Sequence, residues 1–218
     1  MTASPTFTGA LAAVGGDANW TRLPTEETVV DAIALLKADH MEIERLFKAF
    51  ERAGDRAKTT KAALVSKIVG ALCAHAAVEE QLFYPAVRAE VEQASDYVLD
   101  SLEEHHVVTW LCAELDGMRP DHERFDSKVR VLIENVRYHV AGEEHELLPV
   151  VRSALGRKRL TELGAQMEQA KRVAPTHPHP RIPDVPPGIA IAGAVAGAVD
   201  RARDVGKKLF DEARHMAS

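Results

Sequence analysis

The chain has 218 residues, of which 46% are hydrophobic and 28% charged, and its 33 acidic and 27 basic residues give a formal net charge of −6. This composition is typical of a folded globular protein, and the acidic balance argues against nucleic-acid binding by phosphate neutralisation. No uncharged apolar run of about 18 residues indicates a membrane-spanning helix. The only cysteines, Cys73 and Cys112, cannot form a disulfide framework, and no basic residue precedes Arg22. We therefore expect a cytoplasmic protein.

The predicted organisation begins with a flexible N-terminal arm over residues 1–24, which is rich in Gly, Ala, Ser and Thr and has no apolar period. A helix signal follows at Thr25, because this residue can cap a helix and two acidic residues come directly after it. Helical patterns with short breaks then continue to about residue 173, and the alternation typical of strands is absent.

Four long helices are predicted from apolar residues that recur every three or four positions. The breaks between these helices fall near Gly54, near residues 93–96 and at residues 117–121. Each apolar stripe carries one histidine near its middle, in chain order His40, His75, His105 and His139. We therefore expect an all-α, up-down-up-down four-helix bundle over residues 25–173, with a short fifth helix at about residues 158–172 packed on it.

A C-terminal extension follows the bundle. Residues 174–188 are rich in proline and are expected to form a linker, and residues 189–218 are expected to form a C-terminal helix. The apolar start of this helix has small residues at four-residue spacing, but it spans only 11 residues before Asp200, too few to cross a membrane. We expect the helix to dock on the bundle or on a second copy in a homodimer, rather than to contact a membrane.

Two segments of the chain repeat each other at an offset of 64 residues. The matched residues are His75, Glu79, Glu80 and Pro85 in the first segment and His139, Glu143, Glu144 and Pro149 in the second. Four-residue spacing places a histidine and a glutamate side by side on one helix face. Ionised carboxylates on a buried stripe are costly unless a cation neutralises them, so Glu79 and Glu143 predict a bound metal ion. Glu80 and Glu144 are expected behind the ligands or at the surface.

The four histidines are also predicted to lie at one height in the bundle. Residues on adjacent antiparallel helices meet when they are equidistant from the connecting turn. The midpoints between successive histidines fall at positions 57.5, 90 and 122, close to the three breaks. Four imidazoles and two carboxylates exceed the usual four ligands of Zn²⁺ and suit two ions bridged by carboxylates. Mixed nitrogen and oxygen ligands without thiolate favour iron, with manganese next.

With these motifs the chain resembles the bacterial haemerythrin-like, or HHE cation-binding, family over about residues 28–170. Two further motifs that carry the resemblance are Asp39-His40 and Glu104-His105. The resemblance implies a four-helix bundle with an oxo- or hydroxo-bridged, non-haem di-iron centre. It implies that the four histidines are terminal ligands of two irons and that the two glutamates bridge them: His40, His75, His105, His139, Glu79 and Glu143.

The sequence departs from the oxygen-carrying members of this family at Thr109. The carriers have a second histidine there, four residues after the ligand of the third helix. Either one iron keeps an open position, or another residue fills it. The candidates are Glu44, His106, Tyr84 and Tyr138. An open position is what a metal enzyme needs.

The leading functional prediction is an oxidoreductase that acts on hydrogen peroxide, catalase-like, in oxidative-stress defence. One alternative is a non-enzymatic binder or sensor of oxygen, nitric oxide or iron, and another is a bundle with a purely structural metal. A ferritin-like di-iron oxidase needs two Glu-x-x-His motifs, and the chain has one, at Glu103 and His106. The expected partners are small molecules and not nucleic acid.

Overall fold

The computed structural model describes residues 30–180, 196–206, 209 and 212. The predicted N-terminal arm, the predicted helix start at Thr25, residues 181–188 of the predicted linker, and residues 189–195 and most of 207–218 of the predicted C-terminal helix lie outside these residues. The elements are α1 (Ala32–Arg52), α2 (Lys58–Val78), the π-helix η1 (Glu79–Phe83), α3 (Tyr84–Glu90), the 3₁₀-helix η2 (Glu92–Ala94), α4 (Ser95–Leu115), α5 (Phe125–Gly142), the π-helix η3 (Glu143–Leu147), α6 (Leu148–Lys171) and a helix over residues 196–206.

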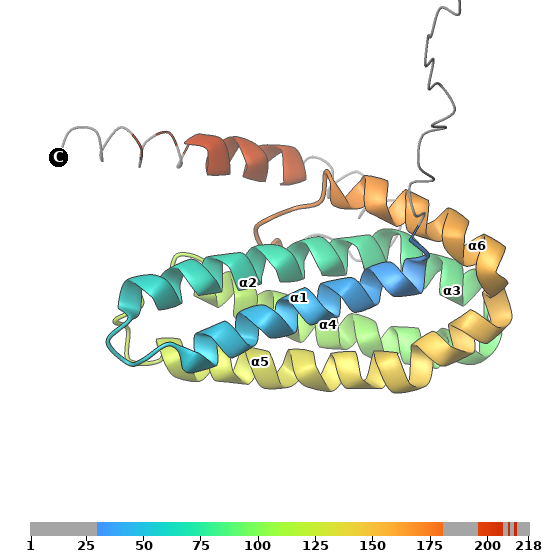
Figure 1. The fold of residues 1–218 in the computed structure, drawn as a ribbon, viewed down its shortest axis with the longest axis horizontal. Coiled ribbons are helices and arrows are strands. Elements are labelled where there is room, and N and C mark those ends of the chain that lie inside the picture. The colour runs from blue at the N-terminus through green and yellow to red at the C-terminus, as the bar shows by residue number, and fades with distance from the viewer. Residues whose placement is uncertain (1–29, 181–195, 207–208, 210–211, 213–218) are drawn as a thin grey trace, which may run out of the picture.

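The helices α1, α2, α4 and α5 lie alongside one another in an up-down-up-down bundle, as Figure 1 shows. The turns between them coincide with the predicted breaks, and the described residues contain no strand. The predicted all-α bundle is therefore confirmed. Asp31 caps the start of α1, because its side chain accepts a hydrogen bond of 2.9 Å from the Ala34 N–H.

Both repeated segments contain a π-helix at the same place, beginning at the first glutamate of the Glu-Glu pair. In each segment a proline follows at the start of the next α-helix, at Pro85 and Pro149. Proline cannot donate to the carbonyl four residues back and its ring crowds that carbonyl, so the helix widens before it. The Tyr84 N–H accordingly donates to the Glu79 carbonyl, five residues back. The wider turn changes which side chains face the interior after His75 and His139.

Two apolar clusters fill the bundle, one on each side of a polar layer. The first cluster contains Leu36, Phe83 and Leu148, and the second contains Phe47, Ile68, Leu132 and others. The polar layer consists of six buried side chains, each at most 4% exposed: His40, His75, Glu79, His105, His139 and Glu143. The predicted site residues thus lie at one level inside the bundle.

The C-terminal half of α6 is the predicted fifth helix. Gly156 has a φ of 68°, a value that L side chains rarely adopt, and this turn directs the rest of α6 back over the bundle. Leu160 and Leu163 are buried in the first apolar cluster. A Cβ added at Gly164 would lie 2.3 Å from the Val30 carbonyl oxygen, so glycine permits α6 to contact the start of α1.

One predicted stripe is wrong in part. On α4, Ser101 and Val108 are buried, whereas Leu102 and Thr109 are only half-buried. The predicted stripe alternated steps of four and three residues from Val98, whereas the buried face takes the step of three first, through Ser101, His105, Val108 and Cys112. Because an α-helix has 3.6 residues per turn, both orders reach His105 and Cys112, but they place the residues in between on different sides of the stripe. Thr109 therefore does not face the interior as Val108 does.

In the described part of the C-terminal extension, two histidines hold the last helix, and one of them, His177, also contacts the bundle. His177 faces Asp116 at the end of α4 and Asp204 in the last helix, and His179 faces Asp200. We call these five residues the tail clasp. A Cβ at Gly197 would lie 2.3 Å from the Val173 carbonyl oxygen, so the last helix packs closely on the chain that precedes the linker.

By length and composition alone, the continuous helical segment Lys58–Glu90 is long and apolar enough to cross a membrane. In the structure, its residues Val65, Ile68 and Leu72 are buried in the second apolar cluster. That placement is typical of a core helix in a bundle.

Candidate metal centre

The four histidines of the polar layer form two pairs. The ring centroids of His40 and His75, from α1 and α2, are 5.0 Å apart. Those of His105 and His139, from α4 and α5, are 4.7 Å apart, with their Nε2 atoms 3.2 Å from each other. Each pair thus presents two imidazole nitrogens to one point in the interior.

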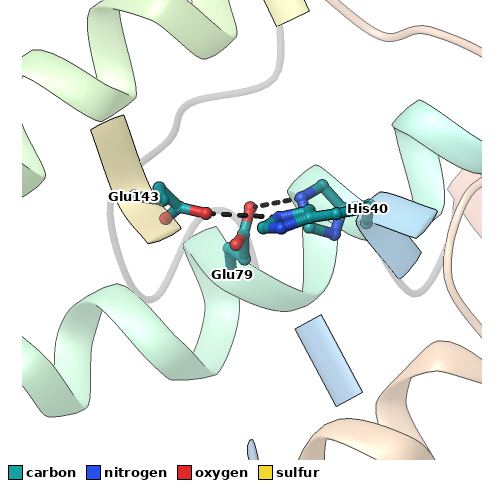
Figure 2. A group of neighbouring side chains, drawn as sticks. His40, Glu79 and Glu143 are labelled. Atoms are coloured by element: carbon teal, nitrogen blue, oxygen red, sulfur yellow. Dashed lines mark ion pairs between the residues drawn. The ribbon is translucent and has the colours of Figure 1, made fainter. Parts of the chain in front are cut away.

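Two fully buried carboxylates connect the two pairs. Glu79 Oε2 lies 3.1 Å from His75 Nε2 and 3.4 Å from His105 Nε2. Glu143 Oε2 lies 3.4 Å from His40 Nε2 and 3.8 Å from His139 Nε2. Figure 2 shows Glu79 and Glu143 from different elements converging beside His40. Because each carboxylate contacts one imidazole of each pair, the arrangement suits two cations that share both carboxylates.

The polar atoms left without partners also fit cations. Both carboxylate oxygens of Glu79, Oε2 of Glu143 and Nε2 of His40 and His75 are buried and have no hydrogen-bond partner among the described residues. Buried polar groups are normally paired, so these atoms indicate a bound group that satisfies them. Two sets of donor atoms are close enough to hold metal ions: His40, His75, Glu79 and Glu143 in one, and Glu79, His105 and His139 in the other. The residues present therefore fit a pair of metal ions, and the set at α4 and α5 has one protein ligand fewer.

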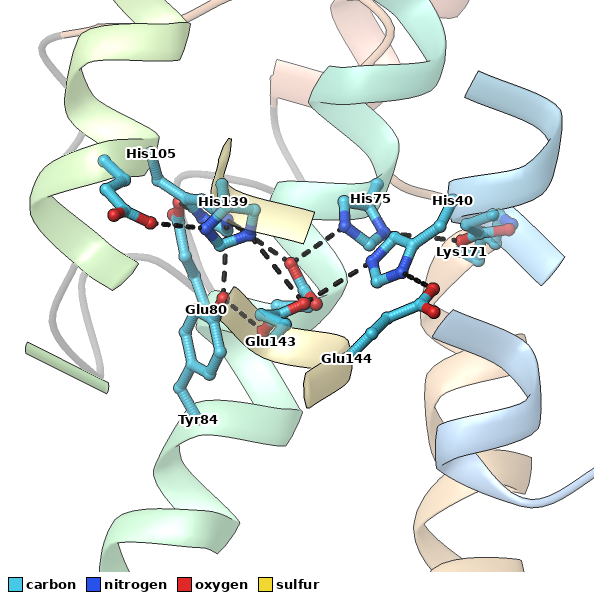
Figure 3. Close-up of polar contacts among 12 residues, drawn as sticks. His40, His75, Glu80, Tyr84, His105, His139, Glu143, Glu144 and Lys171 are labelled. Atoms are coloured by element: carbon cyan, nitrogen blue, oxygen red, sulfur yellow. Dashed lines mark hydrogen bonds and ion pairs between the residues drawn. The ribbon is translucent and has the colours of Figure 1, made fainter. Parts of the chain in front are cut away.

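A ring of four acidic residues surrounds the imidazoles, each facing the Nδ1 atom of a histidine. Figure 3 labels two of them, Glu80 and Glu144. The pairs are Glu144 with His40 at 2.8 Å, Glu80 with His105 at 2.9 Å, Glu104 with His139 at 2.8 Å, and Asp39 with His75 at 3.7 Å. The last distance exceeds a hydrogen bond, and Asp39 is also paired with Lys171 of α6. Such outer carboxylates orient a ligand ring and increase its basicity.

Each of these acidic residues is adjacent in sequence to one proposed ligand but contacts a histidine on another helix. Asp39 precedes His40 and contacts His75, and Glu80 follows Glu79 and contacts His105. Sequence reasoning placed Glu80 and Glu144 only behind the ligands or at the surface, and assigned no partner to any of the four. The available signal was an acidic residue directly before His40 and His105 and directly after Glu79 and Glu143. The pairing itself depends on how the helices are rotated.

The charges of the layer change its protonation. Burial alone would lower the pKa of His40, but its contact with Glu143 and the charge of Glu79 outweigh burial and raise this pKa to about 9. For His105, contacts with Glu79 and Glu80 likewise outweigh burial and raise the pKa to about 10. Burial alone would raise the pKa of Glu143, but His40 and His139 lower it to about 2. Without metal, protons on His40 and His105 therefore offset the carboxylate charge, and a metal must displace them.

Tyr84 is the only one of the four additional candidates that the structure brings to the described site. Its hydroxyl donates a hydrogen bond of 2.9 Å to Glu143 Oε1 and lies 3.4 Å from His105 Nε2. Burial and the charges of Glu143 and Glu79 raise the pKa of Tyr84 well above its usual value. The phenol therefore keeps its proton in the metal-free protein and is located at the three-ligand set.

The other three candidates lie away from the cluster. Glu44 pairs with the Arg137 guanidinium at 2.9 Å. The His106 side chain is 43% exposed and lies 3.6 Å from Glu103. Tyr138 is 73% exposed. The expectation that one of these three completes the site is thus not supported by their positions.

A cavity of about 20 Å³, called the chamber below, adjoins the imidazoles of His75, His105 and His139. Its other lining residues are apolar: Ile43, Leu72, Ala76, Val108, Val136 and Val140. Leu72 and Val136 precede the histidines of their helices by three residues, whereas Glu79 and Glu143 follow them by four. The chamber therefore lies on the opposite side of the imidazole layer from the carboxylates. Thr109 does not line it.

Comparison with known proteins gives consistent matches. The family model described as the hemerythrin HHE cation binding domain matches residues 31–151, more than half of the chain. An uncharacterized hemerythrin-like protein of Schizosaccharomyces pombe is 25% identical over 171 residues, which cover 78% of this chain and 83% of the yeast protein. A DNA nickase of Nostoc is 26% identical over 137 residues, which cover 63% of this chain but only 38% of that enzyme.

Among solved structures, a Mycobacterium kansasii protein containing a hemerythrin HHE cation binding domain is similar in fold. The TM-score is 0.56 at 24% sequence identity, and the match covers 66% of this chain and 88% of the mycobacterial chain. The likeness supports the bundle architecture derived above.

Proposed function

Because the chain belongs to the hemerythrin HHE cation-binding family, we propose that its polar layer holds a non-haem di-iron centre that reacts with hydrogen peroxide in a catalase-like manner. The ligands in this proposal are His40, His75, Glu79, His105, His139 and Glu143. The observation that carries it is the pair of fully buried carboxylates, Glu79 and Glu143, between two pairs of imidazoles with unpartnered inner atoms. Nitrogen and oxygen donors without thiolate suit iron.

Iron would supply one-electron redox changes and Lewis acidity, both of which serve the conversion of two hydrogen peroxide molecules into two waters and one dioxygen. The outer carboxylates Glu80 and Glu104 fix the rings of His105 and His139 by facing their Nδ1 atoms. The Tyr84 hydroxyl holds Glu143 Oε1, which leaves Oε2 toward the imidazoles. The raised pKa of Tyr84 keeps the proton on the phenol, so in this proposal Tyr84 serves as a fixed hydrogen-bond donor to Glu143.

The two ligand sets differ in their number of protein ligands, and this difference favours reaction at the set with fewer ligands. The set at α1 and α2 has four protein ligands, whereas the set at α4 and α5 has three, and Tyr84 lies beside it. The chamber touches both histidines of the three-ligand set, His105 and His139, but only His75 of the four-ligand set. A small molecule in the chamber would therefore meet the less fully ligated position.

A second candidate function is a non-enzymatic binder or sensor of dioxygen or nitric oxide. The specific observation in its favour is the lining of the chamber, which apart from the imidazoles consists only of apolar side chains. Such a lining suits an apolar diatomic molecule and offers hydrogen peroxide no hydrogen-bond partner.

One experiment separates the two functions. The iron-loaded protein is reduced anaerobically, given hydrogen peroxide or dioxygen, and followed by its visible spectrum and by dioxygen evolution. The enzyme proposal expects repeated peroxide consumption with dioxygen release in proportion to bound iron. A long-lived dioxygen adduct without peroxide turnover would instead support the binder, and no reaction with either molecule would leave the metal a structural role.

A further inference from the structure

The four interfaces between neighbouring helices of the bundle are not equally close. The backbones of α1 and α2 approach each other closely along their length, as do those of α4 and α5, whereas α1 and α5 approach each other much less. Polar bridges cross this looser seam at two levels. Arg137 of α5 reaches Glu44 and Glu51 of α1, and Glu144 reaches His40. Between these two bridges, apolar side chains form the seam.

A groove of about 280 Å³ lies along this seam at the surface. Its residues come from α1 and from the segment of α5 and η3 that faces it. They include the exposed Met41, the buried Phe47 and, at the rims, Arg137 and Glu144. The rims are thus charged, while the floor is apolar.

The groove and the chamber share a wall of three side chains, Ile43 from α1 and Val136 and Val140 from α5. Ile43 and Val136 are buried, and Val140 is half-buried. None of the three is polar, so none is held in place by a hydrogen bond of its side chain. Rotation of aliphatic side chains occurs on fast timescales, so such a wall can open without movement of a helix.

We propose that the groove between α1 and α5 is the route by which a small uncharged molecule reaches the chamber, and that Ile43, Val136 and Val140 form the gate. The inference rests on the proposed function, because the chamber matters only if the imidazoles hold a reactive ion. It adds to that function a site of access and a class of reactant.

The reactant class follows from size and charge. A water molecule needs about 10–15 Å³ of cavity volume measured with a water-sized probe, and the chamber has about 20 Å³. It therefore admits molecules of two to four atoms. An anion crossing the apolar gate would lose its hydration without gaining a partner, so the gate selects uncharged molecules. Dioxygen, nitric oxide and hydrogen peroxide belong to this class, and superoxide and nitrite do not.

The test replaces Val140, the half-buried residue of the gate, with a larger and with a smaller side chain. Nitric oxide is the probe, mixed rapidly with the reduced, iron-loaded full chain, and the second-order rate constant is measured. Val140→Trp is expected to lower this constant about tenfold and Val140→Ala to raise it severalfold, because the first narrows and the second widens the gate. Ile43→Phe closes the gate from α1 and should also slow the reaction.

The matched control is Val131→Trp, on the outer face of α5 where Val131 is 46% exposed. It should leave the rate constant unchanged. Iron content and melting temperature are measured for every variant, so that loss of metal or of folding is not mistaken for closure.

A second readout does not depend on reactivity. Crystals of the protein pressurised with xenon, an apolar probe, should show xenon in the groove against Val140, and Val140→Trp should remove it. Equal rate constants in the wild type and the Val140 and Ile43 variants at full iron content would overturn the route while leaving the metal function intact. Xenon absent from the groove would also overturn it. A wild type that binds iron but reacts with no small molecule would instead contradict the proposed function.

Discussion

The polar layer and the tail clasp, two clusters of histidine and carboxylate in the described part of the chain, differ in the atoms that stay unpaired. In the tail clasp, His177 uses both ring nitrogens, with Nδ1 3.1 Å from Asp116 and Nε2 2.9 Å from Asp204. Asp200 accepts hydrogen bonds of 3.1 Å from the backbone N–H groups of Thr176 and His177. In the polar layer the Nδ1 atoms of the histidines face the outer carboxylates, whereas the Nε2 atoms and the oxygens of Glu79 and Glu143 converge in the interior. Unpaired convergent atoms, rather than the number of histidines, therefore mark a metal site.

Burial explains why the two clusters need different solutions. The Glu79 and Glu143 side chains have no exposed surface, whereas the Asp204 side chain is 46% exposed and the His177 side chain 17% exposed. Water and counterions screen the exposed Asp204, and the buried Asp200 accepts two backbone hydrogen bonds and faces His179, so histidines suffice to balance the carboxylates of the clasp. The buried carboxylates lack water, so protons or cations bound inside the bundle must balance them.

The largest expected effect is loss of iron from the polar layer. His75→Ala and Glu143→Ala should each reduce the iron content well below that of the wild type, because every ligand serves one shared centre. The matched control is His177→Ala, which removes an imidazole from the tail clasp and should leave the iron content unchanged. Metal analysis of the purified variants makes the comparison. Full iron retention in both ligand variants would show that the site lies elsewhere.

Removal of the metal should destabilise the bundle. Without a cation the layer relies on imidazolium–carboxylate pairs, so chelation at neutral pH should lower the melting temperature by about 5–10 °C. Deletion of residues 174–218, which takes away the clasp histidines but no proposed ligand, should leave the size of this chelator-dependent shift unchanged. Calorimetry with and without chelator measures both. An unchanged melt would mean that Glu79 and Glu143 are not neutralised by metal.

A smaller effect is expected from the ring of outer carboxylates. Glu80→Gln and Glu104→Gln keep the size of the side chain but remove the charge behind His105 and His139, and should weaken iron binding about 10–100-fold. Glu103→Gln is the matched control, because Glu103 neighbours Glu104 but its side chain is 82% exposed. Competition with a chelator of known affinity provides the measurement. Equal iron affinities in all three variants would show that the outer carboxylates do not strengthen iron binding.

The smallest effect concerns the tail clasp and pH. Burial alone would lower the pKa of His177, but Asp204 and Asp116 outweigh burial and raise this pKa, against the opposing charge of Arg203. A raised folded-state pKa means that the stabilisation is complete below the unfolded value of 6.5 and is lost as the pH rises through the folded value.

The backbone amides of the last helix should therefore exchange faster at alkaline pH. The free energy of opening of this helix should fall by about 1 kcal/mol or less, because the His177–Asp204 pair is partly exposed. His177→Gln should abolish the pH dependence of the protection factors over residues 196–206. Asp200 and His179 remain as a second contact, so the helix should stay docked. Protection that rises with pH in the wild type would contradict the assigned charge of His177.

The sequence was sufficient to predict the four long helices, their breaks and the six residues of the polar layer, because each depends on spacing within one helix or on the distance from a connecting turn. His75 with Glu79 and His139 with Glu143 are examples, since four residues return to the same face. Contacts between helices could not be predicted in this way. The pairing of Glu80 with His105 depends on a π-turn that Pro85 induces, and the location of Tyr84 depends on the same turn. On α4 no second motif fixed the rotation of the helix, and counting four residues from His105 led to Thr109 instead of Val108.

The central claim is that two cations share Glu79 and Glu143 between the two imidazole pairs. Anomalous X-ray scattering at the iron edge, from crystals of the iron-loaded protein, tests it most directly. The account predicts two peaks of similar height, one beside His40 and His75 and one beside His105 and His139, with a carboxylate of each glutamate between them. A single peak, or iron at His177 and His179 with none in the bundle, would contradict it.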